Sequence, residues 1–245
     1  MRDSRPFLTA EWRYLLVANY AVDPALLKPL VPAGTELDVW DGLALVSLVG
    51  FRFLRTSVLG VPIPFHRNFD EVNLRYYVRR KGPDGVWRRG VSFVREIVPR
   101  TAIALVARLV YNEPYVSRRM RHSIGASAVP GGGPATVSYG WSDGGRWHTL
   151  SAATTGTAAQ PPAGTEGEFT IEHYWGYTRQ RDGGTMEYHV DHVPWRIWQA
   201  ASVDIDVDVA RVYGAQWAGP LEGPPRLTLV AEGSPVSVYP GTRIV

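Results

Sequence analysis

The chain has 245 residues, 45% of them hydrophobic, and a formal net charge of +3. This length and apolar content predict one domain, residues 1–245, with a continuous core. The absence of cysteine excludes disulfides, thiolate nucleophiles and cysteine-based metal centres. No apolar run approaches the ~20 residues that span a bilayer, and the N-terminal residues carry no secretory signal, so we expect a cytoplasmic protein without a membrane partner.

Many short strands, separated by Gly- and Pro-rich turns, are predicted along the chain together with few helices. In the first half these elements are a strand over 13–22, a helix over 25–30, a hairpin over 37–53, an irregular loop over 57–68, a second hairpin over 69–97, and a helix from Pro99 to Leu109. In the second half they are a short strand over 115–122, a hairpin over 135–153, a helix from Thr165 to Thr178, strands over 185–193 and 195–204, a helix over 206–213, and closing strands over 227–231 and 236–239. This pattern predicts an α+β fold, mainly antiparallel β, with a sheet curled into a barrel or sandwich and two or three helices against it.

The hairpin over residues 69–97 concentrates ionisable side chains inside a well-patterned strand. Its first strand has two unlike faces, because apolar Val72, Leu74, Tyr76 and Val78 alternate with Glu71, Asn73, Arg75 and Tyr77. The turn over 81–85 contains Gly and Pro, so the second strand returns antiparallel beside the first. That return brings Arg95 and Glu96 near Glu71.

These residues are the candidate site. Glu71 and Glu96 are candidate acid/base catalysts, because burial raises the pKa of a carboxyl toward neutrality. Candidate ligand-binding residues are the cations and the histidine most able to meet an anion there: Arg75, Arg95, Arg100 and His173. The alternative interpretation is an ion-pair lattice on a solvated sheet face.

No metal or cofactor is predicted. His189 and Asp191 share one face of their strand, whereas His192 points to the other, so these three side chains do not converge on one ion. The sequence contains no nucleophile-elbow, P-loop or dinucleotide-binding motif.

Four stretches, residues 15–53, 69–78, 90–97 and 169–195, resemble in sequence and order the uncharacterised DUF2071 family, also called YqjF-like. Proteins of this family look like relatives of acetoacetate decarboxylase. The resemblance implies an acetoacetate decarboxylase-like β-barrel with a central cavity, and Glu71 matches the glutamate of that barrel.

The resemblance breaks at the catalytic lysine. Acetoacetate decarboxylases carry a lysine pair after a stretch similar to residues 94–99, and the amine attacks a keto acid as a Schiff-base nucleophile. Here Arg100 and Thr101 stand in those positions, and the only lysines are Lys28 and Lys81. A guanidinium stays protonated and forms no imine, so we do not expect Schiff-base decarboxylation.

Our leading hypothesis from sequence is a small-molecule-binding protein that holds an anionic organic acid between Glu71, Arg75, Glu96 and Arg100. One alternative is a lyase or hydrolyase that uses glutamate acid/base catalysis. The other is an arginine-rich interaction protein acting through clusters over residues 79–89 and 118–121, although we do not expect nucleic-acid binding because the opposite charges nearly balance. The sequence leaves the ligand, the pathway and homo-oligomer formation open.

Overall fold

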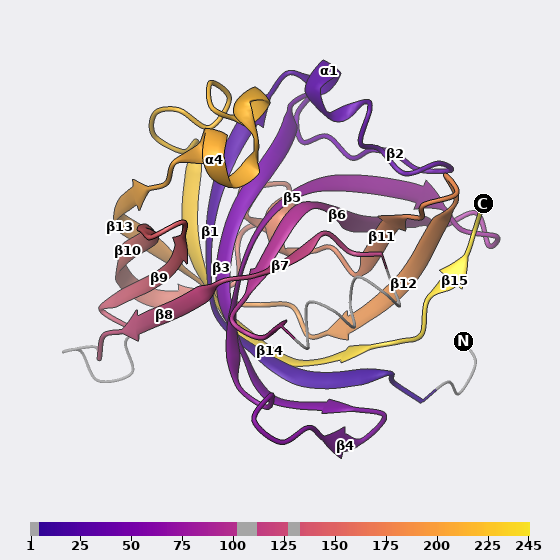
Figure 1. Ribbon diagram of the computed structural model, residues 1–245. Coiled ribbons are helices and arrows are strands. Elements are labelled where there is room, and N and C mark those ends of the chain that lie inside the picture. Colours follow the sequence, from indigo (N-terminus) through magenta and orange to yellow (C-terminus); the bar gives the residue numbers. More distant parts are fainter. Residues whose placement is uncertain (1–4, 102–111, 127–132) are drawn as a thin grey trace.

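The computed structural model describes residues 5–101, 112–126 and 133–245 (Figure 1). The main strands are β1 (Leu8–Val22), β3 (Ala44–Val58), β5 (Phe69–Lys81), β6 (Trp87–Val98), β9 (Thr136–Asp143), β10 (Arg146–Ala159), β11 (Trp175–Arg179), β12 (Thr185–His192), β13 (Ile197–Asp206) and β14 (Leu227–Val238). Shorter strands are β2 (Glu36–Leu37), β4 (Val61–Pro62), β7 (Tyr115–Ser117), β8 (Arg119–Ile124) and β15 (Thr242–Arg243). The helical elements are α1 (Pro24–Leu27), α3 (Glu166–Ile171), α4 (Val209–Tyr213) and the 3-10 turn η2 (Ala215–Trp217).

The strands form one mostly antiparallel sheet whose pairing returns on itself. The order is β12, β11, β6, β5, β3, β1 and β14, and β14 pairs with β12 again. Within the described residues only β6 with β7 and β6 with β11 run parallel. β13, β10, β9 and β8 continue the sheet from β14 as a separate curved layer at the left of Figure 1, with α4 above it. The predicted mainly antiparallel fold with few helices is confirmed.

The two faces of β5 pack against different surroundings. Val72, Leu74, Tyr76 and Val78 belong to the main core cluster, which also contains Trp141 of β9 and Trp217 of η2. Glu71, Asn73 and Arg75 point the other way, where they line a cavity. The alternation predicted for this strand therefore decides which side chains enter the core and which enter the cavity.

The hairpin predicted over residues 37–53 is confirmed only at its turn, Asp41-Gly42, because β2 pairs with β5 and not with β3. Asp41 has a φ of 48° and Gly42 a φ of 76°, while Trp40 bridges Leu43 across the turn. Positive φ at both central residues is the geometry of the tight hairpin turn that this dipeptide favours.

The helix predicted from Thr165 to Thr178 is only half right. Thr165 caps it as expected, accepting a hydrogen bond from the Glu168 amide at 3.3 Å, but α3 ends at Ile171. The residues that follow form β11, which pairs with both β12 and β6. Aromatic and β-branched residues suit a sheet, and the pairing available here overrides the helical spacing. His173 therefore lies between α3 and β11 and not on a helix.

Smaller differences concern boundaries. The strands predicted over 227–231 and 236–239 are one strand, β14; the segment over 115–122 divides into β7 and β8; and the loop over 57–68 contains β4. The helix predicted after Pro99 falls mainly outside the described residues. Among the residues that the structure describes, no helix is both long and apolar enough to cross a membrane.

Candidate functional site

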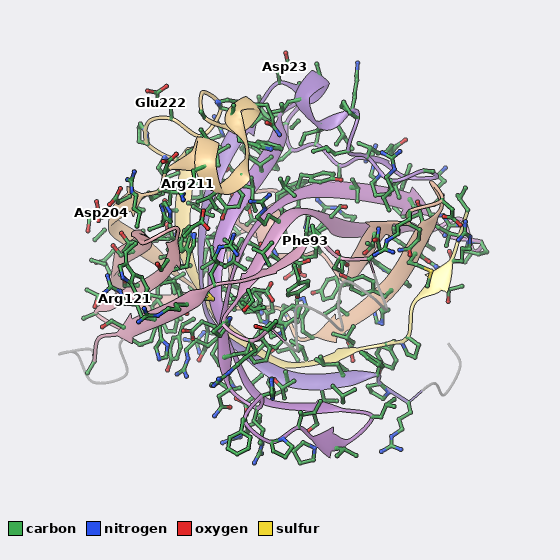
Figure 2. The ribbon with its side chains drawn as sticks, in the orientation of Figure 1. Asp23, Phe93, Arg121, Asp204, Arg211 and Glu222 are labelled. Atoms are coloured by element: carbon green, nitrogen blue, oxygen red, sulfur yellow. The ribbon has the colours of Figure 1, made fainter. Side chains whose placement is uncertain are left out.

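A cavity of about 450 Å³ lies against the face of β5 that carries Glu71 and Arg75. This volume is in the range that holds a small organic molecule. One part of its lining is polar, formed by Glu71, Asn73, Arg75, Glu96, Glu113, Tyr115, Thr170, His173 and Tyr188. The rest is mainly apolar and aromatic. Figure 2 shows Phe93, a lining residue of β6, in the middle of the molecule, whereas Asp23, Asp204 and Glu222 lie at the periphery.

Strand register brings the polar residues together. Asn73 of β5 lies opposite Glu96 of β6, and Glu96 lies opposite Tyr115 of β7. Glu71, two residues before Asn73, falls on the same face of β5. Glu113 lies two residues before β7, and the Glu96 amide donates to the carbonyl of the intervening Pro114 at 3.2 Å. Three neighbouring strands thus deliver three carboxyl groups to one end of the cavity.

Each carboxyl group of this cluster is buried, and two are well hydrogen-bonded. Glu71 accepts from Asn73 Nδ2 and from the Tyr115 hydroxyl, both at 3.0 Å. Glu113 accepts from the Tyr188 hydroxyl at 3.1 Å and from the Thr178 hydroxyl. Oε2 of Glu96 is buried without a hydrogen-bond partner.

Burial raises the pKa of all three carboxyls. It raises the pKa of Glu71 to about 7, although hydrogen bonds from Asn73 and Tyr115 oppose it. It also raises the pKa of Glu113 to about 7, against the hydrogen bonds from its neighbours. The pKa of Glu96 is raised further, because the charges of Glu113 and Glu71 add to the cost of burial. At neutral pH this cluster therefore holds protons that it can exchange with a ligand.

Arg75 is the one arginine or lysine in the cavity lining that the structure describes. Its Nη2 donates to the carbonyl of Thr170 at 3.1 Å, its guanidinium carbon lies 5.6 Å from the Tyr77 ring centre, and its Nε is buried without a partner. Among the described residues, no carboxylate oxygen lies within 4 Å of this guanidinium. A carboxylate of a ligand would supply the missing bidentate partner.

His173 lines the cavity beside Asp38. Its Nε2 lies 3.2 Å from Asp38 Oδ2, which also accepts from Arg89 Nε at 2.7 Å. Burial lowers the pKa of His173 to about 4, so the ring is neutral at pH 7. In this arrangement Nε2 carries the proton toward Asp38, and Nδ1, which has no partner, keeps its lone pair.

The structure brings together four of the predicted site residues, Glu71, Arg75, Glu96 and His173, and leaves out two. Arg95 does not line the cavity, because it lies on the opposite face of β6 from Glu96 and donates to the carbonyl of Val212 in α4. Arg100 is exposed beyond the end of β6 and is also absent from the lining. Successive side chains of a strand point to opposite faces, so Arg95 and Glu96 cannot share a site.

Three residues of the cavity were missed by the reasoning from sequence. Glu113 falls between the predicted helix and the predicted strand over 115–122, Tyr115 starts that strand, and Tyr188 is one residue of the strand predicted over 185–193. Glu113 and Tyr115 reach the site through the parallel pairing of β7 with β6, which no local pattern indicates.

The histidines of β12 are arranged as predicted. Tyr188, Val190 and His192 line the cavity, whereas His189 packs between Trp175 and Tyr239, with ring centres 4.8 and 5.6 Å away. Within the described ranges, no group of three histidines or carboxylates is placed to hold a metal ion.

Neither lysine belongs to the cavity lining. Lys28 is exposed after α1, and Lys81 is exposed at the end of β5, where its ammonium lies 5.3 Å from the Trp87 ring centre. An amine able to condense with a carbonyl is therefore absent from the lining that the structure describes.

The arginines of the β5–β6 hairpin are largely paired with carboxylates. Arg80 and Arg88 both contact Glu187, at 3.1 and 2.5 Å, and Arg79 contacts Glu36 at 2.8 Å. In the second basic cluster, Arg118 contacts Asp143 at 2.7 Å. These pairs neutralise much of the local positive charge, which weakens the interpretation of the clusters as a surface for phosphates.

Gly176 of β11 leaves space for the ring of Tyr188, whose hydroxyl donates to Glu113. It pairs with Tyr188, and a Cβ atom at this position would overlap the Tyr188 ring. We expect Gly176→Ala to push the phenol away from Glu113 and to lower the free energy of unfolding by about 1–3 kcal/mol. Urea denaturation measures this change. Gly219→Ala, after η2, is the control, because nothing lies near its Cβ position and its φ is not positive; an equal loss in both variants would contradict the steric argument.

Comparisons with known proteins agree with this architecture. The DUF2071 family model, described as an uncharacterized conserved protein, matches residues 9–235. The uncharacterized protein YqjF of Bacillus subtilis is 36% identical over 120 residues, which are 48% of this chain and 47% of YqjF. The match thus spans about half the length of that relative.

Two solved structures are similar over nearly the whole chain. Acetoacetate decarboxylase from Legionella pneumophila has a TM-score of 0.65 and 12% identity, covering 99% of this chain and 88% of its own. The enduracididine biosynthesis enzyme MppR, complexed with pyruvate, has a TM-score of 0.67 and 14% identity, covering 99% of this chain and 91% of its own. At such identities the likeness shows the fold alone, and it confirms the acetoacetate decarboxylase-like fold expected from the resemblance.

Proposed function

The chain belongs to the DUF2071 family, and we propose that it binds a small organic acid in the cavity, with the acid's carboxylate on Arg75 and its reactive or polar end at the carboxyl cluster of Glu71, Glu96 and Glu113. The cyclic strand pairing supports a barrel that encloses this cavity. We retain a cytoplasmic location as part of the proposal.

The observation that carries this proposal is the guanidinium of Arg75. It is held in the cavity without an ion-pair partner among the described residues, beside carboxyls whose raised pKa leaves them partly protonated. Partly protonated carboxyls repel an anion less than ionised ones and can donate hydrogen bonds to it. MppR, which shares the fold, was solved in complex with an organic acid, pyruvate.

The test is a binding screen combined with chemical trapping. Pyruvate, acetoacetate, 3-hydroxybutyrate and decanoate are compared by thermal shift and calorimetry. We expect at least one of these acids to stabilise the protein. Borohydride reduction in the presence of the keto acids should give no mass adduct, and the Lys28→Arg, Lys81→Arg double variant should bind as the unchanged protein does. Loss of binding in that variant, or a trapped adduct, would contradict a cavity without an amine.

A second candidate function is favoured by the pKa values. Glu71 and Glu113 titrate near pH 7, which suits a general acid or base, so the cavity also supports a lyase or hydrolyase that moves protons through these glutamates. If an acid of the screen is turned over, we expect Glu71→Gln to reduce kcat by at least about 100-fold while binding persists. Glu11→Gln, in an ion pair on β1 away from the cavity lining, is the matched control. Unchanged turnover in Glu71→Gln would remove this role.

A further inference from the structure

The part of the cavity away from the carboxyl cluster is an aromatic wall. Phe53 of β3 lies opposite Trp12 of β1 on one side and opposite Phe69 of β5 on the other, so the three rings occupy one level of the sheet. Phe53 and Phe69 stack with centres 4.5 Å apart, and Trp12 lies 5.7 Å from Phe53. Phe51, opposite Glu71, joins this wall directly to the carboxyl cluster.

The wall leads to the surface. Arg75 and Phe69 are six positions apart along β5, which is roughly 20 Å of strand, and Glu71 lies between them. Beyond the level of Phe69 the lining continues through Val58 of β3 to Ile63, which follows β4 and is 41% exposed. The β3–β4 hairpin projects at the bottom of Figure 1.

Among the described residues of the wall there is no acidic or arginine side chain, and the titratable side chain near its outer end is His66. The buried polar atoms there without partners, Trp12 Nε1 and Thr56 Oγ1, are both neutral. Desolvating a charge against such a surface is unfavourable, whereas burying hydrocarbon on it is favourable. An acid of two or three carbons would leave the wall unused.

From this polarity gradient we propose that the ligand is a monocarboxylic acid with a long apolar body. Its carboxylate lies at Arg75, the carbons next to it pass the carboxyl cluster, and its alkyl or aryl-alkyl chain lies along Trp12, Phe53 and Phe69 with the far end toward Ile63. The position of the carboxylate rests on the proposed function; the apolar body rests on the wall.

The experiment is a series of unbranched acids from butanoic to hexadecanoic acid, measured by calorimetry below their micelle concentrations. We expect the Kd to fall about fourfold for each added methylene until the wall is filled. A Kd that does not depend on chain length, while binding still depends on Arg75, would contradict the long apolar ligand but not the carboxylate site at Arg75. If primary alcohols bind as tightly as the acids of equal length, the carboxylate site at Arg75 is contradicted, whereas apolar binding along the wall is not.

Two variants two residues apart test the path to the surface. Ile63 lines the cavity, whereas Phe65 is 87% exposed and is not part of the lining. Ile63→Asp should weaken the longest acids at least tenfold and leave butanoic acid unchanged. Phe65→Asp should change neither, since its φ of 62° is one that Asp tolerates. Equal affinities of both variants for hexadecanoic acid would overturn the assigned direction.

Discussion

Glu113→Gln should make the protein more stable at pH 8 by about 3 kcal/mol and leave its stability at pH 4 nearly unchanged. Glu113 has a pKa of about 7 in the folded protein against 4.5 for a free carboxyl, and 2.5 pH units correspond to about 3 kcal/mol. Glutamine keeps the oxygen that accepts from Thr178 and Tyr188. Its amide also replaces a repelling carboxylate with a donor facing Glu96.

The pH window follows from the direction of the shift. Below pH 4.5 the carboxyl is protonated in both the folded and the unfolded protein, so it contributes no pH dependence. Between about pH 4.5 and 7 the unfolded chain releases this proton first, and stability falls as the pH rises; above 7 the loss is complete. His173 has the opposite slope, because its lowered pKa costs stability as the pH falls from 6.5 to about 4. The difference between variant and unchanged protein, from urea denaturation at several pH values, isolates Glu113.

Glu187→Gln is the matched control, with the opposite sign expected. Glu187 is also buried, with 5% of its side chain exposed, but it contacts the guanidinium groups of Arg80 and Arg88. Removing its charge leaves both without a full counter-ion, so we expect a loss of about 2–4 kcal/mol at pH 8. If both variants lose stability at pH 8, the carboxyl cluster is not destabilised by its own charge.

The central hairpin was predictable because its information is local. The alternation from Glu71 to Val78 and the turn after Lys81 determine strand direction and facing without reference to the rest of the chain. The same period of two also separates Arg95 from Glu96, so the strand pattern itself argued against placing both in one site. The facing of β12 was predictable for the same reason.

The remainder of the site depends on pairings that are distant in sequence. Glu113 enters because β7 pairs in parallel with the end of β6, and His173 enters because β11 replaces the second half of a predicted helix. In both places the local pattern was compatible with a helix or its end, and the sheet edge offered by β6 decided the outcome. The sequence could therefore locate the cavity and the carboxyls of Glu71 and Glu96. It could not locate Glu113 or show how His173 is oriented.

Arg75→Met should weaken the binding of decanoic acid by about 100-fold, equivalent to roughly 2.7 kcal/mol. Methionine keeps an unbranched side chain of similar length but has no charge and no donors, so a ligand carboxylate would lose its ion pair in surroundings of low polarity. Pyruvate should lose binding altogether, because so small an acid gains little from the aromatic wall. Calorimetry at pH 7 with both acids gives the two values.

The decisive comparison is with Arg95→Met on the neighbouring strand. Arg95 is half-buried like Arg75, but its guanidinium bonds to the Val212 carbonyl on the other face of the sheet. Its loss should cost about 1 kcal/mol of stability and leave the affinity for decanoic acid unchanged. A general effect of removing positive charge would weaken binding equally in both variants, since each lowers the net charge by one. Only a direct contact in the cavity makes Arg75 differ from Arg95, and equal losses would therefore rule out the carboxylate position that the proposed function assigns.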